Sequence, residues 1–485
     1  MPANITISPQ AQATTAVAIG RLLASAVVTM LAALATLACA VAIDPEPGPA
    51  VLAVVLCLSF SRSHLNDDLR GRLEAAIMLP VVGLITAGIG MLLHYEPWLG
   101  AAVFVTGMFL SIWIRQFGTM ARRAGSLIAL PFVVILTVPH LPSQHTESLL
   151  LRIVVPIVVA LLALVWVAAF QALGRWLRVL PPPAKPVMTP IAPKPESSLR
   201  PSATTRMAIQ MAVALAASFA IGYVFFAERW AWIVLTAFIV NSGNRGRLDV
   251  AYKSVLRVMG AAVGTIVALT LALHLGLHGA TAVALILMSV FLGICLRPLN
   301  YAWWALFVTI ALALLQGFGG SPAPNILRLR LEEIIIGALI GVAVAWLIYP
   351  VRSTMVLRRR IADALLALSD AFDPATASTP DSFVASLASV EQVAPAFKAS
   401  RLLTRPFKPV HPADWIDALL ACRAPAIALI HQQAAPAHVR RAIGAARKAM
   451  REPETLLPAL RALGDSLTHQ HSEISSSPTT DQTPA

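Results

Sequence analysis

The chain has few charged residues. Only 13% of its 485 residues are charged, whereas a soluble globular protein has about 25%. Acidic residues are the scarcer kind, with 24 Asp and Glu against 37 Lys and Arg, so the formal net charge is +13. Hydrophobic residues make up 57% of the chain, and the mean hydropathy is +0.74. This composition excludes a soluble globular protein and indicates a membrane protein.

Motifs for covalent chemistry and metal binding are also missing. The four cysteines, Cys39, Cys57, Cys295 and Cys422, form no CxxC pair, so neither a disulfide framework nor a metal site is indicated. The sequence has no Walker loop, no HExxH and no GxSxG motif. We therefore expect no enzymatic activity and no cofactor. Zinc-finger spacing and interleaved basic and aromatic residues are absent too, which argues against nucleic-acid binding.

Long apolar stretches dominate the chain from about residue 17 to residue 350. Most of them are long enough to cross a bilayer core of about 30 Å, which takes about 20 helical residues. The Pro-rich segment Pro181–Pro201 divides them into two sets. We expect helices near residues 17–43, 49–60, 74–93, 98–114, 124–139, 150–170, 207–227, 230–240, 254–273, 279–296, 300–317 and 332–350. The sequence thus predicts an all-α, polytopic membrane protein of about twelve transmembrane helices.

Basic residues alternate between successive loops. Loops 61–72, 115–123, 175–206, 241–253, 297–300 and 352–360 hold most of them, and the loops between are acidic or nearly neutral. The positive-inside rule then predicts that both termini lie in the cytoplasm. No basic region precedes the first apolar stretch, so we interpret it as a retained span rather than a signal peptide. Arg328 and Arg330 are exceptions, since they fall on the outer side beside Glu332 and Glu333.

The two halves resemble each other. Phe109–Arg115 is similar to Phe291–Arg297, and each segment closes the fourth span of its half. With an even number of spans per half, the copies share one orientation and are related by an axis along the membrane normal. We therefore predict two parallel six-helix repeats, although unrelated leucine-rich bundles also look alike.

The second span of each half is short. Ala50–Phe60 and Ala231–Val240 rise only about 16 Å as helices, which is half of a bilayer core. Short segments at equivalent positions of two repeats often mark a transporter's binding site. Alternatively, these helices start earlier, with a proline in the first turn. We place the pathway near them, with Trp232 and Asn241 as substrate-binding candidates.

Composition divides the chain into five segments. Residues 1–180 form a diverged first repeat, residues 181–204 a Pro-rich cytoplasmic linker, and residues 205–352 the second repeat. Residues 353–471 are predicted to form a cytoplasmic helical module, and residues 472–485 a disordered tail. Within the module, apolar residues recur at three- and four-residue steps, which predicts helices over Val351–Asp370, Asp381–Leu403, Asp414–Gln433 and Ala437–His469.

Charged residues inside spans are costly, and they are functional candidates by default. Arg330 and Glu333 are three residues apart and share a helix face. We expect Glu332 and Glu333 in the first helical turn, where the helix dipole favours negative charge. One interpretation is that these charged residues form an interfacial ion pair that anchors the helix. The other is that one carboxylate, Glu333 or Glu332, takes up and releases a proton during transport.

Arg257 precedes Gly260 and Gly264, whose four-residue spacing lets another helix approach closely. A guanidinium group can bind a carboxylate through two hydrogen bonds. Arg257 is therefore a candidate for binding an anionic substrate. The alternative is a basic anchor at the cytoplasmic interface.

Four segments in the second half carry a resemblance to a known family. In order, they are Trp230–Thr236, Arg257xxGly260xxxGly264, Tyr301–Thr309 and Arg330xxGlu333xxxGly337. Over about 150 residues this half resembles the membrane domain of the fusaric acid resistance and aromatic acid exporter family. The first half lacks the RxxGxxxG motif and has no carboxylate after Arg152, so it resembles a diverged copy.

The resemblance implies an inner-membrane efflux permease for aromatic carboxylic acids or related toxic organic anions, driven by the proton gradient. Arg257 and Arg330 would meet the anion, and Glu333 would couple protons. Such permeases often work with a periplasmic adaptor protein. The family also resembles plant anion channels built from two six-span protomers, so by analogy this chain would form its own pseudo-dimer, and a passive anion channel is an open alternative. A homo-oligomer is open as well. A membrane scaffold whose working part is the tail is a further alternative.

Overall fold

The computed structural model describes most of the chain. The described residues are 9–45, 47–61, 69–118, 149–180, 202–227, 229–275, 279–318, 324–373, 380–407, 410–432 and 437–476, with a few isolated positions between 121 and 136. Within these ranges the helices are joined by turns, and there is no strand. The chain divides into a membrane unit, which ends at Tyr349, and a tail unit from Pro350 onward that also includes Gly243–Tyr252.

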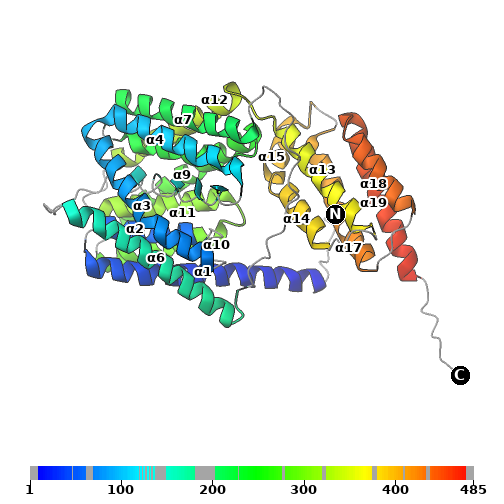
Figure 1. The fold of residues 1–485 in the computed structure, drawn as a ribbon, viewed down its shortest axis with the longest axis horizontal. Helices are drawn as coiled ribbons and strands as arrows, with labels where there is room; N and C mark the ends of the chain where they lie inside the picture. The colour runs from blue at the N-terminus through cyan, green and yellow to red at the C-terminus, as the bar shows by residue number, and fades with distance from the viewer. Residues whose placement is uncertain are drawn as a thin grey trace. The chain divides into compact units, whose positions relative to one another are not determined.

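The first half of the membrane unit forms α1 (Pro9–Ile43), α2 (Pro47–Phe60), α3 (Leu69–Tyr95), α4 (Pro97–Trp113) with the 3-10 turn η2 (Ile114–Phe117), and α6 (Leu149–Trp176) (Figure 1). Helices α1, α2 and α6 pack around one apolar core that includes Phe60 and Val159. Most of the predicted span 124–139, the linker up to Pro201 and the loop 139–148 lie outside the described residues.

The second half forms α7 (Ala203–Phe225), α8 (Trp230–Asn241), α9 (Arg247–Leu275), α10 (Gly279–Leu296), α11 (Tyr301–Phe318) and α12 (Pro324–Leu347). Among the described residues, six helices are long and apolar enough to cross a membrane, namely α1, α4, α6, α7, α9 and α10. The all-α membrane prediction is confirmed at this level. The full set of twelve spans and the internal repeat stay predictions.

Both second helices are short, but α2 starts three residues before Ala50 with prolines in its first turn, as the alternative interpretation expected. Helix α2 has 14 residues, with Pro47 and Pro49 in its first turn, and α8 has 12. A proline fits the first turn because its missing N–H has no helical acceptor there. Helices of this length rise about 18 to 21 Å, which is less than a bilayer core.

Helix α12 begins eight residues before the predicted span. Pro324 is its first residue, so Glu332 and Glu333 lie in the third turn rather than the first. The expected stabilisation of these carboxylates by the helix dipole is therefore wrong, since that effect falls off within the first turn. Helix α9 likewise begins at Arg247, which places Arg257 roughly 15 Å along the helix.

The tail unit consists of α13 (Ser353–Ala371), α14 (Pro380–Glu391), α15 (Ala394–Thr404), α16 (Pro412–Ala421), α17 (Arg423–His431), α18 (Ala437–Ala449) and α19 (Pro453–Ser476). Three of the long helices predicted from the sequence are each divided into two helices in the structure. The second helix of each pair has a proline within its first three residues, namely Pro395, Pro425 and Pro453, and a proline cannot continue the preceding helix. Helix α19 also reaches Ser476, so the prediction of disorder from Ser472 is wrong for its first five residues.

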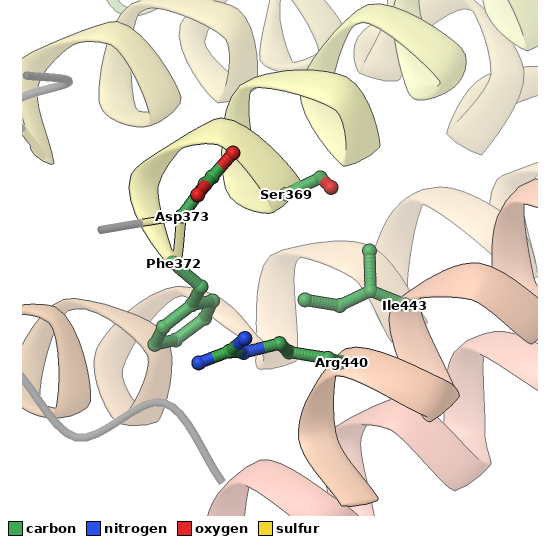
Figure 2. A pocket seen from close by; sticks show the side chains of 5 residues that line it. All are labelled: Ser369, Phe372, Asp373, Arg440 and Ile443. Atoms are coloured by element: carbon green, nitrogen blue, oxygen red, sulfur yellow. The ribbon is translucent and has the colours of Figure 1, made fainter. Parts of the chain in front are cut away.

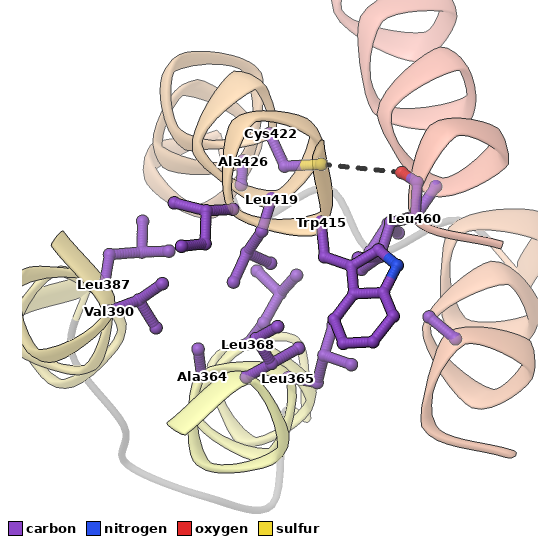
Figure 3. Packing of buried hydrophobic residues seen from close by; sticks show 14 of the residues in the cluster. Ala364, Leu365, Leu368, Leu387, Val390, Trp415, Leu419, Cys422, Ala426 and Leu460 are labelled. Atoms are coloured by element: carbon purple, nitrogen blue, oxygen red, sulfur yellow. Dashed lines mark hydrogen bonds between the residues drawn. The ribbon is translucent and has the colours of Figure 1, made fainter. Parts of the chain in front are cut away.

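The helices of the tail unit share one apolar core (Figure 3). Leu365, Leu368, Leu387 and Leu419 are fully buried in it, and each such side chain contributes about 1.5 to 3 kcal/mol. The thiol of Cys422 lies 4.0 Å from the carbonyl oxygen of Leu460. Burial, and secondarily the charge of Asp465, raises the pKa of the Cys422 thiol to about 11.

A small polar network joins α15 to α16. Arg401 Nη1 donates to Asp414 and to Asp417, both at 2.7 Å, and Asp414 also accepts from the backbone N–H of His411 at 2.8 Å. Burial acts to raise the pKa of Asp414, but these two donors outweigh it, so its pKa lies below its usual value. In the same way, Arg401 and Lys398 overcome burial and lower the pKa of Asp417.

This network predicts a stability difference that depends on pH. A carboxylate with a lowered pKa stabilises the fold above its unfolded pKa of about 3.9, and the contribution is lost as the pH falls through the lower, folded pKa. Arg401→Leu is therefore expected to lower the thermal midpoint of the full chain at pH 7, and to change it little at about pH 2. Calorimetry at both values checks this. An equal loss at both values would assign Arg401 a packing role instead.

Candidate functional site

Helices α8 and α12 pack closely against each other, with Gly337 against the backbone of α8 and Gly341 against side chains of α8. A Cβ on Gly337 would lie 2.5 Å from the carbonyl oxygen of Ile233, and one on Gly341 would lie 2.8 Å from Nδ2 of Asn241. These contacts advance along both helices together, so α8 and α12 run in the same direction. The α12 face that carries Arg330, Glu333 and Gly337 therefore lies against α8.

Arg330 stacks on an aromatic ring of α8. Its guanidinium carbon lies 4.0 Å from the centre of the Trp232 ring. Arg330 is only 2% exposed and Trp232 only 6%. A guanidinium over a desolvated tryptophan is stabilised by the ring's electron-rich face. The contact holds the charge of Arg330 inside the helical bundle.

Glu333 is fully buried on the same face of α12, with 0% of its side chain exposed. Its Oε1 lies 3.6 Å from Nε of Arg229, whose side chain is 36% exposed. Neither carboxylate oxygen accepts a hydrogen bond from a described residue. The charge of Arg330 also acts on Glu333, but a buried carboxylate without hydrogen-bond donors is poorly solvated. Its protonation state is therefore sensitive to changes in its surroundings.

Arg257 on α9 is 2% exposed. The helix around it approaches α11 closely, since a Cβ on Gly260 would lie 2.6 Å from the carbonyl oxygen of Ala302, and one on Gly264 2.6 Å from that of Leu306. The positive charge of Arg257 is close enough to act on Arg330. The alternative of an interfacial anchor requires an exposed head group, and the burial of Arg257 argues against it.

The structure therefore places Arg257, Arg330, Trp232 and Glu333 in one neighbourhood of the membrane unit. Asn241 lies at the other end of α8, where its Nδ2 donates to the carbonyl oxygen of Ala237 at 3.0 Å.

Glu332 is only partly buried, and it points about 100° away from Glu333 around the helix. Glu333 is thus the better proton-coupling candidate. Sequence reasoning missed Arg229, although its position directly before the short helix α8 was a usable signal.

A pocket of about 270 Å³ lies in the tail unit between the end of α13 and α18 (Figure 2). It is lined by Ser369, Phe372, Asp373, Arg440 and Ile443. Both of its charged residues, Asp373 and Arg440, are exposed. The pocket shares no residue with the buried cluster of the membrane unit.

Apolar helices of spanning length and a buried charged cluster together define a polytopic membrane protein. Residues 213–344 match the fusaric acid resistance protein-like family, which confirms the resemblance of the second half. The matched segment is less than a third of the chain and contains all four residues of the buried cluster. No curated protein and no solved structure matches the chain. The family points to membrane transport of the efflux type rather than to an enzyme.

Proposed function

We propose that this protein exports aromatic carboxylic acids or related organic anions across the inner membrane, driven by the proton gradient. Both termini lie in the cytoplasm in this proposal, as the alternation of basic loops predicts. The proposed partner is a periplasmic adaptor protein, on the ground of the family resemblance. The proposal rests on the family match together with the buried cluster inside the matched segment.

The observation that carries the proposal is the pair of buried arginines. Arg257 and Arg330 come from different helices, both are 2% exposed, and their charges act on each other. Two like charges in a low-dielectric interior repel, so an anion between or beside them would be strongly attracted. The ring of Trp232, against which Arg330 lies, adds an aromatic surface suited to an aromatic acid.

Glu333 supplies the proposed proton coupling. Gain or loss of a proton by Glu333 changes its pairing with Arg229 and the net charge beside Arg257 and Arg330, and it therefore changes the affinity of the cluster for an anion. For export, an inward proton is exchanged for an outward anion. One carboxylate thus links proton transfer to the affinity of the site.

The proposal is tested by reconstituting the full chain in proteoliposomes and following radiolabelled benzoate. Uphill flux is expected when a pH gradient is imposed, and it should disappear when a protonophore collapses the gradient. Benzoate or chloride flux that runs only down its own gradient, with no response to pH, would instead identify a passive anion channel. Deletion of residues 360–485 tests the scaffold alternative, because a transporter is expected to keep some flux.

A further inference from the structure

A second group of polar side chains lies where α10 turns into α11. Arg297 is in this turn, and its guanidinium carbon lies 5.2 Å from the centre of the Trp304 ring. The helices are closely packed here, since a Cβ on Gly293 would lie 3.3 Å from the Trp304 ring. Trp304 therefore holds the Arg297 guanidinium in place beside the first residue of α11, Tyr301.

Arg257 reaches the same place from α9. The contact between Gly260 and the backbone of Ala302 puts the preceding turn of α9, which carries Arg257, beside Tyr301. The positive charges of Arg257 and Arg297 both act on the Tyr301 hydroxyl. Three hydrogen-bond donors from α9, the α10–α11 turn and α11 thus converge.

These donors have buried atoms that the described residues leave unsatisfied. Nε of Arg257, Nη1 of Arg297 and the hydroxyl of Tyr301 are all inaccessible to solvent, and none makes a hydrogen bond of normal geometry with a described residue, although the Arg257 side chain is near enough to the Tyr301 hydroxyl for a weak one. Buried polar atoms are normally paired, because an unpaired one keeps the full cost of losing water. A carboxylate is a matching acceptor, since its two oxygens accept up to about four hydrogen bonds and carry the opposite charge.

We propose that Arg257, Arg297 and Tyr301 form a binding site for the carboxylate group of an organic monoanion. This inference rests on the proposed function, because it assigns recognition of the transported anion to two residues, Arg297 and Tyr301, beyond those considered there. Trp304 is a positioning residue that orients Arg297. The hydroxyl of Tyr301 donates to one carboxylate oxygen, and the two guanidinium groups supply the charge and the remaining donors.

The test uses the full chain in lipid nanodiscs and measures equilibrium binding of radiolabelled benzoate. Tyr301→Phe removes one hydroxyl and is expected to raise the Kd about tenfold, which is typical for the loss of a hydrogen bond to a charged group. Arg297→Gln is expected to raise it by more than about tenfold, since it also removes a charge. Tyr349→Phe is the matched control, because Tyr349 is an exposed residue of the same unit, and its Kd should equal that of the wild type.

Two results would overturn the assignment: a wild-type Kd in both Tyr301→Phe and Arg297→Gln, or no benzoate binding by the wild-type chain. Thermal midpoints of the variants show whether they are folded, and Tyr301→Phe, which removes a single atom, keeps the test decisive if Arg297→Gln fails to fold. The two proposals can fail separately. Benzoate binding that is weakened by these variants, without gradient-driven flux, would refute the exporter and support the site. Gradient-driven benzoate flux with an unchanged KM in both variants would support the exporter and refute the site.

Discussion

Glu333→Gln is expected to reduce gradient-driven benzoate flux to the level of empty vesicles, while the protein accumulates in the membrane at its normal level. Glutamine keeps the size of the side chain but cannot gain or lose a proton, so the proposed link between proton transfer and anion affinity is broken. The substitution also removes the ionic partner that Arg229 has among the described residues. Since the Arg229 side chain is 36% exposed, water can solvate it, and the fold should tolerate the change.

Downhill exchange of benzoate separates coupling from binding in this variant. A neutral residue 333 leaves the two buried arginines in place, so exchange between equal concentrations of labelled and unlabelled benzoate should persist after gradient-driven flux is lost. Glu391→Gln is the matched control, because Glu391 forms an exposed ion pair with Arg423 in the tail unit. Gradient-driven flux at the wild-type rate in Glu333→Gln would reject the coupling role of this carboxylate.

Gly337→Leu is expected to cause a large loss of stability. A Cβ at this position would lie 2.5 Å from the carbonyl oxygen of Ile233 and 2.9 Å from Cβ of Thr236. The first of these atoms is backbone, so the clash can be relieved only if α12 moves away from α8. Overpacking a well-packed interior costs about 1 to 3 kcal/mol, and more when the backbone must shift. The shift would also separate Arg330 from Trp232.

The thermal midpoint of the detergent-solubilised full chain measures this effect, by size-exclusion chromatography after heating. Gly88→Leu on α3 is the control, since Gly88 is exposed and a Cβ there would meet nothing within 4 Å. Its midpoint should match that of the wild type, because leucine suits a surface that faces lipid. Equal midpoints for Gly337→Leu and Gly88→Leu would show that α8 and α12 are not in backbone contact.

The positions of the helices could be predicted because apolar stretches and prolines act locally. Each predicted stretch within the described residues contains a helix, and the short α8 begins and ends within one residue of its predicted bounds. The predicted helix boundaries were wrong where polar residues belong to a helix. Arg328 and Arg330 lie before the predicted span 332–350, yet they belong to α12. A helix satisfies its own backbone whether its side chains are apolar or charged.

The candidate site was predictable only in part. Arg330 and Glu333 follow from their three-residue spacing, which puts them on one helix face whatever surrounds them. The pairing of Glu333 with Arg229, which is 104 positions away in the chain, has no local signature. The convergence of Arg257 and Tyr301 likewise depends on the approach of α9 to α11.

The sequence by itself determined that the chain is helical, that most of it is too apolar for water, and which few charged residues interrupt its helices. These properties depend on neighbouring residues alone, through hydrophobicity and backbone hydrogen bonding. Only the tertiary structure decided which of those charges are buried and which groups face them. Burial and pairing arise when glycines such as Gly260 and Gly337 let particular helices touch, and such contacts join residues that are distant in the chain.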